Sequence, residues 1–270
     1  MDQNYQSLDR GTNPLMQRVR IPGETFALPS GGNFYKDGEL SPEVENGEVH
    51  VHPMTAIDEL VMKSLDKVFS GEAVNEVFGR CIPSVLKPGQ LSAKDVDFLL
   101  IALRKVSYGP DIDVTYTHDC EDAKEHSYPV SLTTYIHNAQ KVNPTTIKTT
   151  FSYKTESGQT VNYLPATYKD IVKLYQRQYA ENNKELTSDE ELHSTLTAVS
   201  AMIHDVDGVT DREQIIEWLT SLPILWLKEI CDAASNTTNW GVKFEVEIEC
   251  KDCGHKVLVP TPLNPISFFT

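Results

Sequence analysis

The sequence lacks the short motifs that mark the common enzyme classes. It has no Gly-x-Ser-x-Gly nucleophile turn, no Gly-x4-Gly-Lys-Ser/Thr phosphate loop, no Gly-x-Gly-x-x-Gly dinucleotide turn and no His-Glu-x-x-His metal motif. Each of these motifs places a nucleophile, a phosphate-binding backbone or a metal ligand where a reaction needs it. Their absence disfavours the hydrolases, nucleotide-binding proteins and metalloproteases that use them.

Positive charge is scarce. The 24 Lys and Arg residues stand against 39 Asp and Glu, so the formal net charge is −15 at pH 7. Because nucleic-acid binding depends mainly on contacts between cations and phosphates, we expect no nucleic-acid partner. No run approaches the roughly 18 consecutive apolar residues of a membrane span, and the first ten residues are polar rather than signal-like. We expect neither a membrane span nor export.

Cysteines are few and odd in number. The five thiols, scattered along 270 residues, do not form the even framework of a secreted, disulfide-stapled domain. We therefore expect a reducing compartment. With 40% hydrophobic and 9% aromatic residues, the chain is long and apolar enough to fold around a hydrophobic core.

Local periodicity predicts where helices and strands lie. Apolar residues at helical spacing behind Ser or Thr caps predict helices over residues 55–70, 72–81 and 92–108, and more helix between 167 and 236. Alternation of period two predicts strands over residues 48–52, 112–116, 130–136, 242–248 and 256–259. A hairpin is predicted over residues 151–163, with its turn at Gly158.

The sharpest local motif lies between the last two predicted strands. Cys250 and Cys253, followed by Gly254, form a Cys-x2-Cys-Gly turn, which aims two thiolates at one tetrahedral cation. This turn is half of a zinc-ribbon site. The other half is expected at Cys120, which follows another alternating strand and has His118 or His126 nearby.

Three interpretations of these cysteines stay open. One is a structural zinc held by Cys250, Cys253, Cys120 and a histidine such as His118. A second is a ribbon that keeps its fold without binding metal. The third is a redox Cys-x-x-Cys pair, although that motif normally opens a helix. The cofactor expected, if any, is a single structural zinc.

These patterns together predict an α+β fold. We expect an N-terminal extended β arm and helical unit, then a zinc-ribbon-like antiparallel sheet interrupted by a helical insertion. The predicted boundaries are 1–54 for the arm, 55–110 for the helical unit, 111–165 with 241–270 for the β region, and 166–240 for the insertion.

Both ends of the chain carry apolar residues in segments that contain Gly or Pro. Such segments can order against a neighbouring chain, where strand addition gives affinity. We therefore hypothesise that residues 14–54 and 260–270 contact partner proteins. The predicted contact residues are Ile21, Phe26, Phe34, Tyr35, Ile266, Phe268 and Phe269.

Several motifs in combination resemble one known family. They are residues 20–23 and 28–35, residues 49–59, residues 99–109, the Cys-x2-Cys-Gly turn, and the Pro-Leu-x-Pro-x-x-Phe-Phe end. Together they resemble the T4-like bacteriophage baseplate protein family, which groups a baseplate hub subunit with a hub-assembly factor. In that family the cysteines look like two zinc-ribbon knuckles. Here Thr117 stands where the first cysteine of one knuckle is expected.

The resemblance implies a non-enzymatic structural protein of a contractile phage tail. It would be made in the host cytoplasm and act in the virion, within a symmetric multi-subunit assembly, through contacts with other baseplate and tail proteins. One alternative is a hub-assembly factor or chaperone that is absent from the mature virion. Another is a metal-dependent or redox enzyme built on Cys250 and Cys253.

Overall fold

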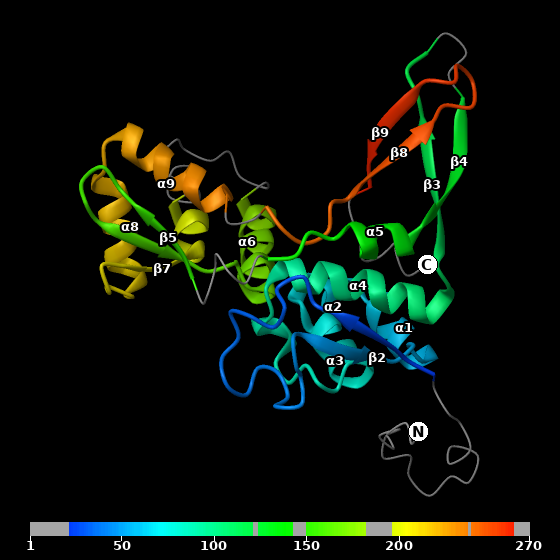
Figure 1. Cartoon of the computed structure of the whole chain (residues 1–270), viewed down its shortest axis with the longest axis horizontal. Coiled ribbons are helices and arrows are strands. Elements are labelled where there is room, and N and C mark those ends of the chain that lie inside the picture. Colours follow the sequence, from blue (N-terminus) through cyan, green and yellow to red (C-terminus); the bar gives the residue numbers. More distant parts are fainter. Residues whose placement is uncertain (1–21, 121–123, 143–149, 182–195, 237–238, 262–270) are drawn as a thin grey trace, which may run out of the picture.

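A computed structural model describes residues 22–120, 124–142, 150–181, 196–236 and 239–261. Helices and small antiparallel sheets make up this part of the chain, which confirms the predicted α+β class. Figure 1 shows a helical body, a second group of helices and strands beside it, and two hairpins that stand away from the body. No helix in the described ranges is long and apolar enough to cross a membrane.

The first core joins an N-terminal hairpin to a group of helices. Strands β1 and β2 pair antiparallel, with Phe26 opposite Val49, and their inward side chains pack against α3 and α4. The elements are β1 (Glu24–Ala27), β2 (Glu48–Val51), α1 (Ala56–Met62), α2 (Leu65–Ser70), α3 (Glu72–Cys81), the 3₁₀ turn η2 (Pro88–Gln90) and α4 (Ala93–Tyr108).

The helices of this core follow the sequence patterns closely, with one correction. Helix α3 spans the predicted residues, and α4 begins where predicted because the Ser92 side chain caps the backbone N–H of Asp95 at 3.1 Å. The single helix expected over residues 55–70 is wrong. It is broken between α1 and α2 at Lys63 and Ser64, which allows both short helices to pack on α3.

A protruding hairpin and a short helix come next. Strands β3 (Asp111–Thr117) and β4 (Glu125–Ser131) pair antiparallel, and α5 (Leu132–Asn138) follows directly. The strand predicted over residues 130–136 is therefore correct only for residues 130 and 131 and wrong for residues 132–136. Leu132, Tyr135 and Ile136 lie three and four residues apart, so a helix brings all three onto the first core, and this packing overrides the β-branched neighbours.

A second core forms around a three-stranded sheet. Strand β6 pairs with both β5 and β7, and helices α8 and α9 pack on these strands. The elements are β5 (Phe151–Lys154), β6 (Thr160–Tyr163), α6 (Tyr168–Glu181), helical residues 196–202, β7 (Ile203–Val206), α8 (Arg212–Ser221) and α9 (Ile224–Asn236).

Strand β7 is not predicted, because only helix is expected between residues 167 and 236. It is short, and its pairing partner β6 lies about 40 residues earlier in the chain, so no local pattern indicates it. The hairpin of β5 and β6 is confirmed, including the turn at Gly158, which has a φ of 91°. The predicted domain boundaries stay predictions.

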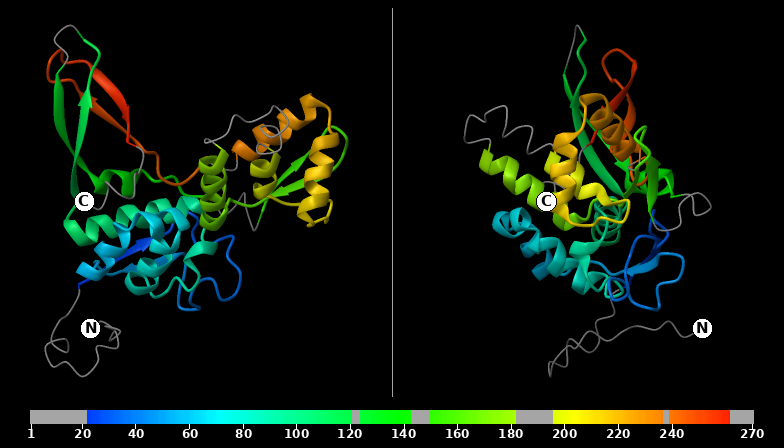
Figure 2. Two further views of the ribbon diagram at one scale, coloured as in Figure 1. Left: turned by 180° about the vertical axis from the view of Figure 1, so that it is seen from behind. Right: turned by 90° about the vertical axis from the view of Figure 1, so that its left-hand side faces the viewer.

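The last hairpin lies beside the protruding hairpin. Strands β8 (Glu245–Glu249) and β9 (Lys256–Pro260) pair antiparallel, as predicted. Figures 1 and 2 show this hairpin beside that of β3 and β4. A small cluster between them contains Tyr128, Ile248 and Val259, so segments more than 100 residues apart share one apolar contact.

Candidate metal centre

Four possible metal ligands meet at the outer end of the paired hairpins. One ligand atom each from His118, Cys120, Cys250 and Cys253 lies within 4.8 Å of the other three. These are the residues that the sequence singles out. His118 Nδ1 lies 3.2 Å from Cys253 Sγ.

Backbone geometry places the two thiols of the later hairpin. The backbone N–H of Cys250 donates to the carbonyl of His255 at 2.9 Å, and that of Gly254 donates to the carbonyl of Cys250 at 2.8 Å. Gly254 has a φ of 72°, a region that side chains with a Cβ rarely adopt. This tight turn carries Cys253 back over Cys250.

The earlier hairpin supplies a different pair of ligands. His118 and Cys120 follow the end of β3 at Thr117, and the N–H of Cys120 donates to the carbonyl of His118 at 3.0 Å. The spacing is His-x-Cys, in place of Cys-x2-Cys. Thr117 therefore does not prevent a complete set of four, because the histidine one position later provides the fourth donor.

Polar contacts fix the two hairpins against each other. His126 Nε2 lies 2.9 Å from Asp252 Oδ1, and the backbone N–H of Lys124 donates to the other oxygen of Asp252 at 3.2 Å. The ammonium of Lys251 donates to the carbonyl of Ser127 at 2.6 Å. His126, which the sequence offers as an alternative ligand, thus holds Asp252 in the turn and is absent from the ligand cluster.

The local electrostatics give the thiols of Cys250 and Cys120 different pKa values. Backbone N–H groups of the turn, first that of Cys253, lower the pKa of Cys250 to about 7 despite desolvation. Desolvation, followed by the effect of Cys253, raises the pKa of Cys120 to about 11. A thiolate at Cys250 with a protonated neighbour is the arrangement expected when several thiols crowd one site.

The predicted partner contacts within the described residues all have contacts in their own chain. Phe26 is buried in the first core. Phe34 stacks on Phe151 with ring centroids 5.5 Å apart, and the Tyr35 hydroxyl donates to the carboxylate of Asp95. Their role toward partners stays a prediction. Ile21, Ile266, Phe268 and Phe269 lie outside the described residues.

Sequence reasoning missed an exposed apolar surface on two helices. Ile57 and Leu60 of α1 and Leu65 of α2 are 68%, 70% and 63% exposed. Their helical spacing predicts a buried face, yet the buried residues of α1 are Asp58 and Met62, and α2 has no buried residue. Phe69 extends this surface to α6 through an edge-on contact with Tyr179, with centroids 5.2 Å apart.

Comparison with known proteins identifies a family. A family model described as T4 bacteriophage base plate protein matches residues 25–270. Neither the curated proteins nor the solved structures contain a significant match. The match covers the hairpins, both cores and all four candidate ligands, and it confirms the resemblance that the sequence motifs indicate.

Proposed function

The chain belongs to the family of T4 bacteriophage base plate proteins, and on that premise we propose that it is a structural component of the hub region of a contractile tail. It acts through protein–protein contacts and has no catalytic role. The observation that carries this proposal is the family match over most of the chain. The exposed large apolar side chains of α1 and α2 support it, because exposed apolar side chains that gather on one surface mark interaction sites.

Mass spectrometry of purified, intact phage particles tests this proposal. A structural hub subunit should be present at a fixed copy number relative to the other baseplate proteins. Its absence from particles, together with its presence on unfinished baseplates, would reject the structural role in favour of an assembly factor. Truncation after Thr261 should leave a folded chain that enters baseplates poorly, if the C-terminal segment contacts partners.

We also propose that His118, Cys120, Cys250 and Cys253 bind one structural zinc ion. Tetrahedral zinc at about 2.3 Å from sulfur and 2.0–2.1 Å from nitrogen places its ligand atoms roughly 3.5–3.8 Å apart. The observed spread of up to 4.8 Å needs only a small contraction to reach that geometry. Three thiolates and an imidazole are also a donor set that zinc prefers.

A structural role for the metal fits the surroundings better than catalysis. Four protein ligands complete a tetrahedral shell and leave no open position for a substrate. The apolar cluster between the hairpins is small, with three buried residues, and small β units commonly need a metal for stability. In this proposal the ion acts as a cross-link between two hairpins that are distant in sequence.

Metal analysis of the purified full-length chain tests the zinc proposal. We expect about one equivalent of zinc per chain, because the site offers one complete set of four ligands. Cys253→Ser should lose most of the metal, whereas the matched control Cys231→Ser, on α9, should retain it. Less than about a tenth of an equivalent in the unmodified protein would contradict the proposal and favour a metal-free ribbon.

A further inference from the structure

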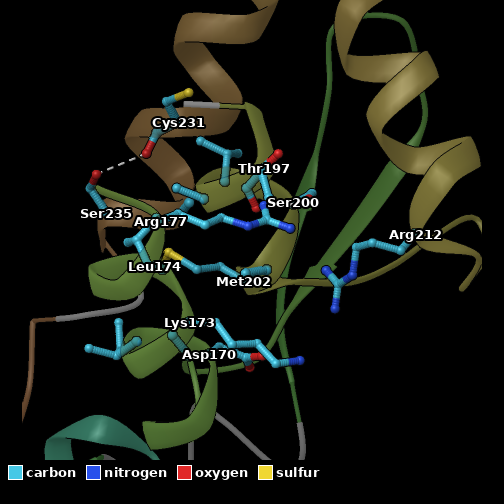
Figure 3. A pocket seen from close by; sticks show the side chains of 16 residues that line it. Asp170, Lys173, Leu174, Arg177, Thr197, Ser200, Met202, Arg212, Cys231 and Ser235 are labelled. Atoms are coloured by element: carbon cyan, nitrogen blue, oxygen red, sulfur yellow. Dashed lines mark hydrogen bonds between the residues drawn. The ribbon is translucent and has the colours of Figure 1, made fainter. Parts of the chain in front are cut away.

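A cavity of about 470 Å³ lies between α6, helical residues 196–202 and α9, far from the thiol cluster. Its volume falls within the range of roughly 300–1,000 Å³ that is typical of ligand pockets. Its floor is apolar and is formed by Ile171, Leu174, Ala198, Val199, Met202 and Ala234. Figure 3 shows these helices enclosing the cavity, with charged side chains at its margin.

The margin of this cavity is cationic. Lys173 and Arg177 come from α6 and Arg212 from the start of α8, and Figure 3 shows Arg212 on the side of the pocket opposite the other two, with its side chain directed toward them. In a chain with a net charge of −15, three converging cations are a marked local exception. An acidic ligand would therefore be attracted to this margin.

These cations are not neutralised by the described part of the chain. Among the described residues, neither Lys173 nor Arg177 forms an ion pair, and Arg212 donates to the carbonyl of Ile203 at 3.1 Å. The one carboxylate in the lining, that of Asp170, accepts from the Thr167 hydroxyl at 2.7 Å as part of the cap of α6. Within the described residues, the lining therefore carries three cationic side chains and one carboxylate.

We infer that this cavity binds an acidic, amphipathic segment of another protein of the same assembly. Apolar side chains of that segment enter the cavity, and its carboxylates meet Lys173, Arg177 and Arg212. An apolar floor with a charged margin, built between helices, is the arrangement by which grooves bind amphipathic helices. The inference takes from the proposed function only that the partner belongs to a baseplate.

Site-specific photo-cross-linking tests the inference. The full-length chain carries p-benzoyl-phenylalanine at Ser235, an exposed position at the margin, and is irradiated during phage infection. The cross-linked peptide is then identified by mass spectrometry. The expected product is a segment of another baseplate protein that is rich in Asp and Glu and carries apolar residues at helical spacing.

Two variants test the two parts of the site. Lys173→Glu combined with Arg177→Glu should lower the cross-link yield about tenfold, because attraction becomes repulsion. The matched control Lys87→Glu with Lys243→Glu changes the charge equally at exposed positions outside the cavity and should leave the yield unchanged. Ala198→Phe fills the cavity and should also lower the yield.

The outcomes separate this inference from the proposed function. A cross-link within the same chain, to a second copy or to a basic segment, or a yield unaffected by the double reversal, would overturn the inference. The proposed function would still stand if intact particles contained the protein. Conversely, an acidic cross-link on unfinished baseplates with no protein in particles would support the inference and reject the structural role.

Discussion

Tyr35 provides the sharpest test of how the N-terminal segment is held. Its hydroxyl donates to Asp95 Oδ2 and accepts from the backbone N–H of Ser92 at 3.2 Å. The other oxygen of Asp95 accepts from the N–H of Ser30 at 3.1 Å. Asp95 is fully buried. One carboxylate at the start of α4 therefore ties the loop after β1 to the first core.

Burial raises the pKa values of both ionisable groups in this network. Desolvation, and next the charge of Asp95, raises the pKa of Tyr35 well above its usual value. Desolvation also raises the pKa of Asp95, although the hydrogen bonds from Ser30, Tyr35 and Ser92 oppose it. The phenol therefore stays protonated and available as a donor at neutral pH.

Tyr35→Phe removes the hydroxyl and leaves the side-chain packing intact. It leaves the N–H of Ser92 and one oxygen of Asp95 without their partner, and each unsatisfied buried group costs about 1–3 kcal/mol. We expect a loss of about 2–4 kcal/mol in the free energy of unfolding, measured by urea denaturation. Amide hydrogen exchange should accelerate in residues 22–54 and remain unchanged in the second core.

Tyr153→Phe is the matched control for this measurement. Tyr153 donates to Glu229 at 3.3 Å in the second core, and loss of this longer bond should cost only about 0.5–1.5 kcal/mol. If Tyr35→Phe were within about 0.5 kcal/mol of the unmodified protein, the structural role derived for Tyr35 would be refuted. A stable variant that failed only in assembly would instead support the predicted role of Tyr35 in partner contact.

Two further predictions concern Asp97 and the glycines with positive φ. Desolvation, opposed by Lys94, raises the pKa of Asp97 to about 6. Since the folded-state pKa lies above the unfolded value of about 3.9, the stabilisation is complete below about pH 4 and is lost as the pH rises through 6. Asn cannot ionise, so Asp97→Asn removes this loss. The gain in the free energy of unfolding of the variant over the unmodified protein should be about 1–2 kcal/mol larger at pH 7 than at pH 4. Solvent screening of the partly exposed side chain keeps the gain this small. Equal pH profiles for variant and unmodified protein in urea unfolding would contradict this. Gly71→Ala and Gly158→Ala both place a Cβ at positive φ, but only at Gly71 would that Cβ meet a neighbour, Val172 of α6, at 2.9 Å. Gly71→Ala should thus cost about 1–3 kcal/mol more than Gly158→Ala in thermal unfolding, and equal costs would refute the close packing of α2 on α6.

The elements that the sequence predicts well are those whose signal is local. Helix α3 spans the residues expected, α4 starts at its Ser92 cap, and strand β8 alternates strictly. The Cys-x2-Cys-Gly turn is equally local, because the turn and its ligands lie within five residues. For this reason Cys250 and Cys253 could be singled out as candidate ligands from the sequence alone.

The other half of the candidate centre depended on the way the hairpins meet. His118 and His126 lie eight residues apart and are equivalent as sequence candidates. Only the packing of β4 against the last hairpin turns His126 toward Asp252 and leaves His118 beside Cys253. The choice between them is a matter of register across more than 100 residues, which no local pattern contains.

The sequence by itself determined the α+β class, most helices and strands, the family and the thiol pair of the later hairpin, since each depends on neighbours along the chain. Tertiary structure decided the rest. It buried Phe26, exposed Ile57 and Leu60, made residues 132–138 a helix, and paired β7 with β6. The physical reason is that burial and strand pairing depend on which distant surfaces a segment meets, and the same periodicity can serve a core or an interface.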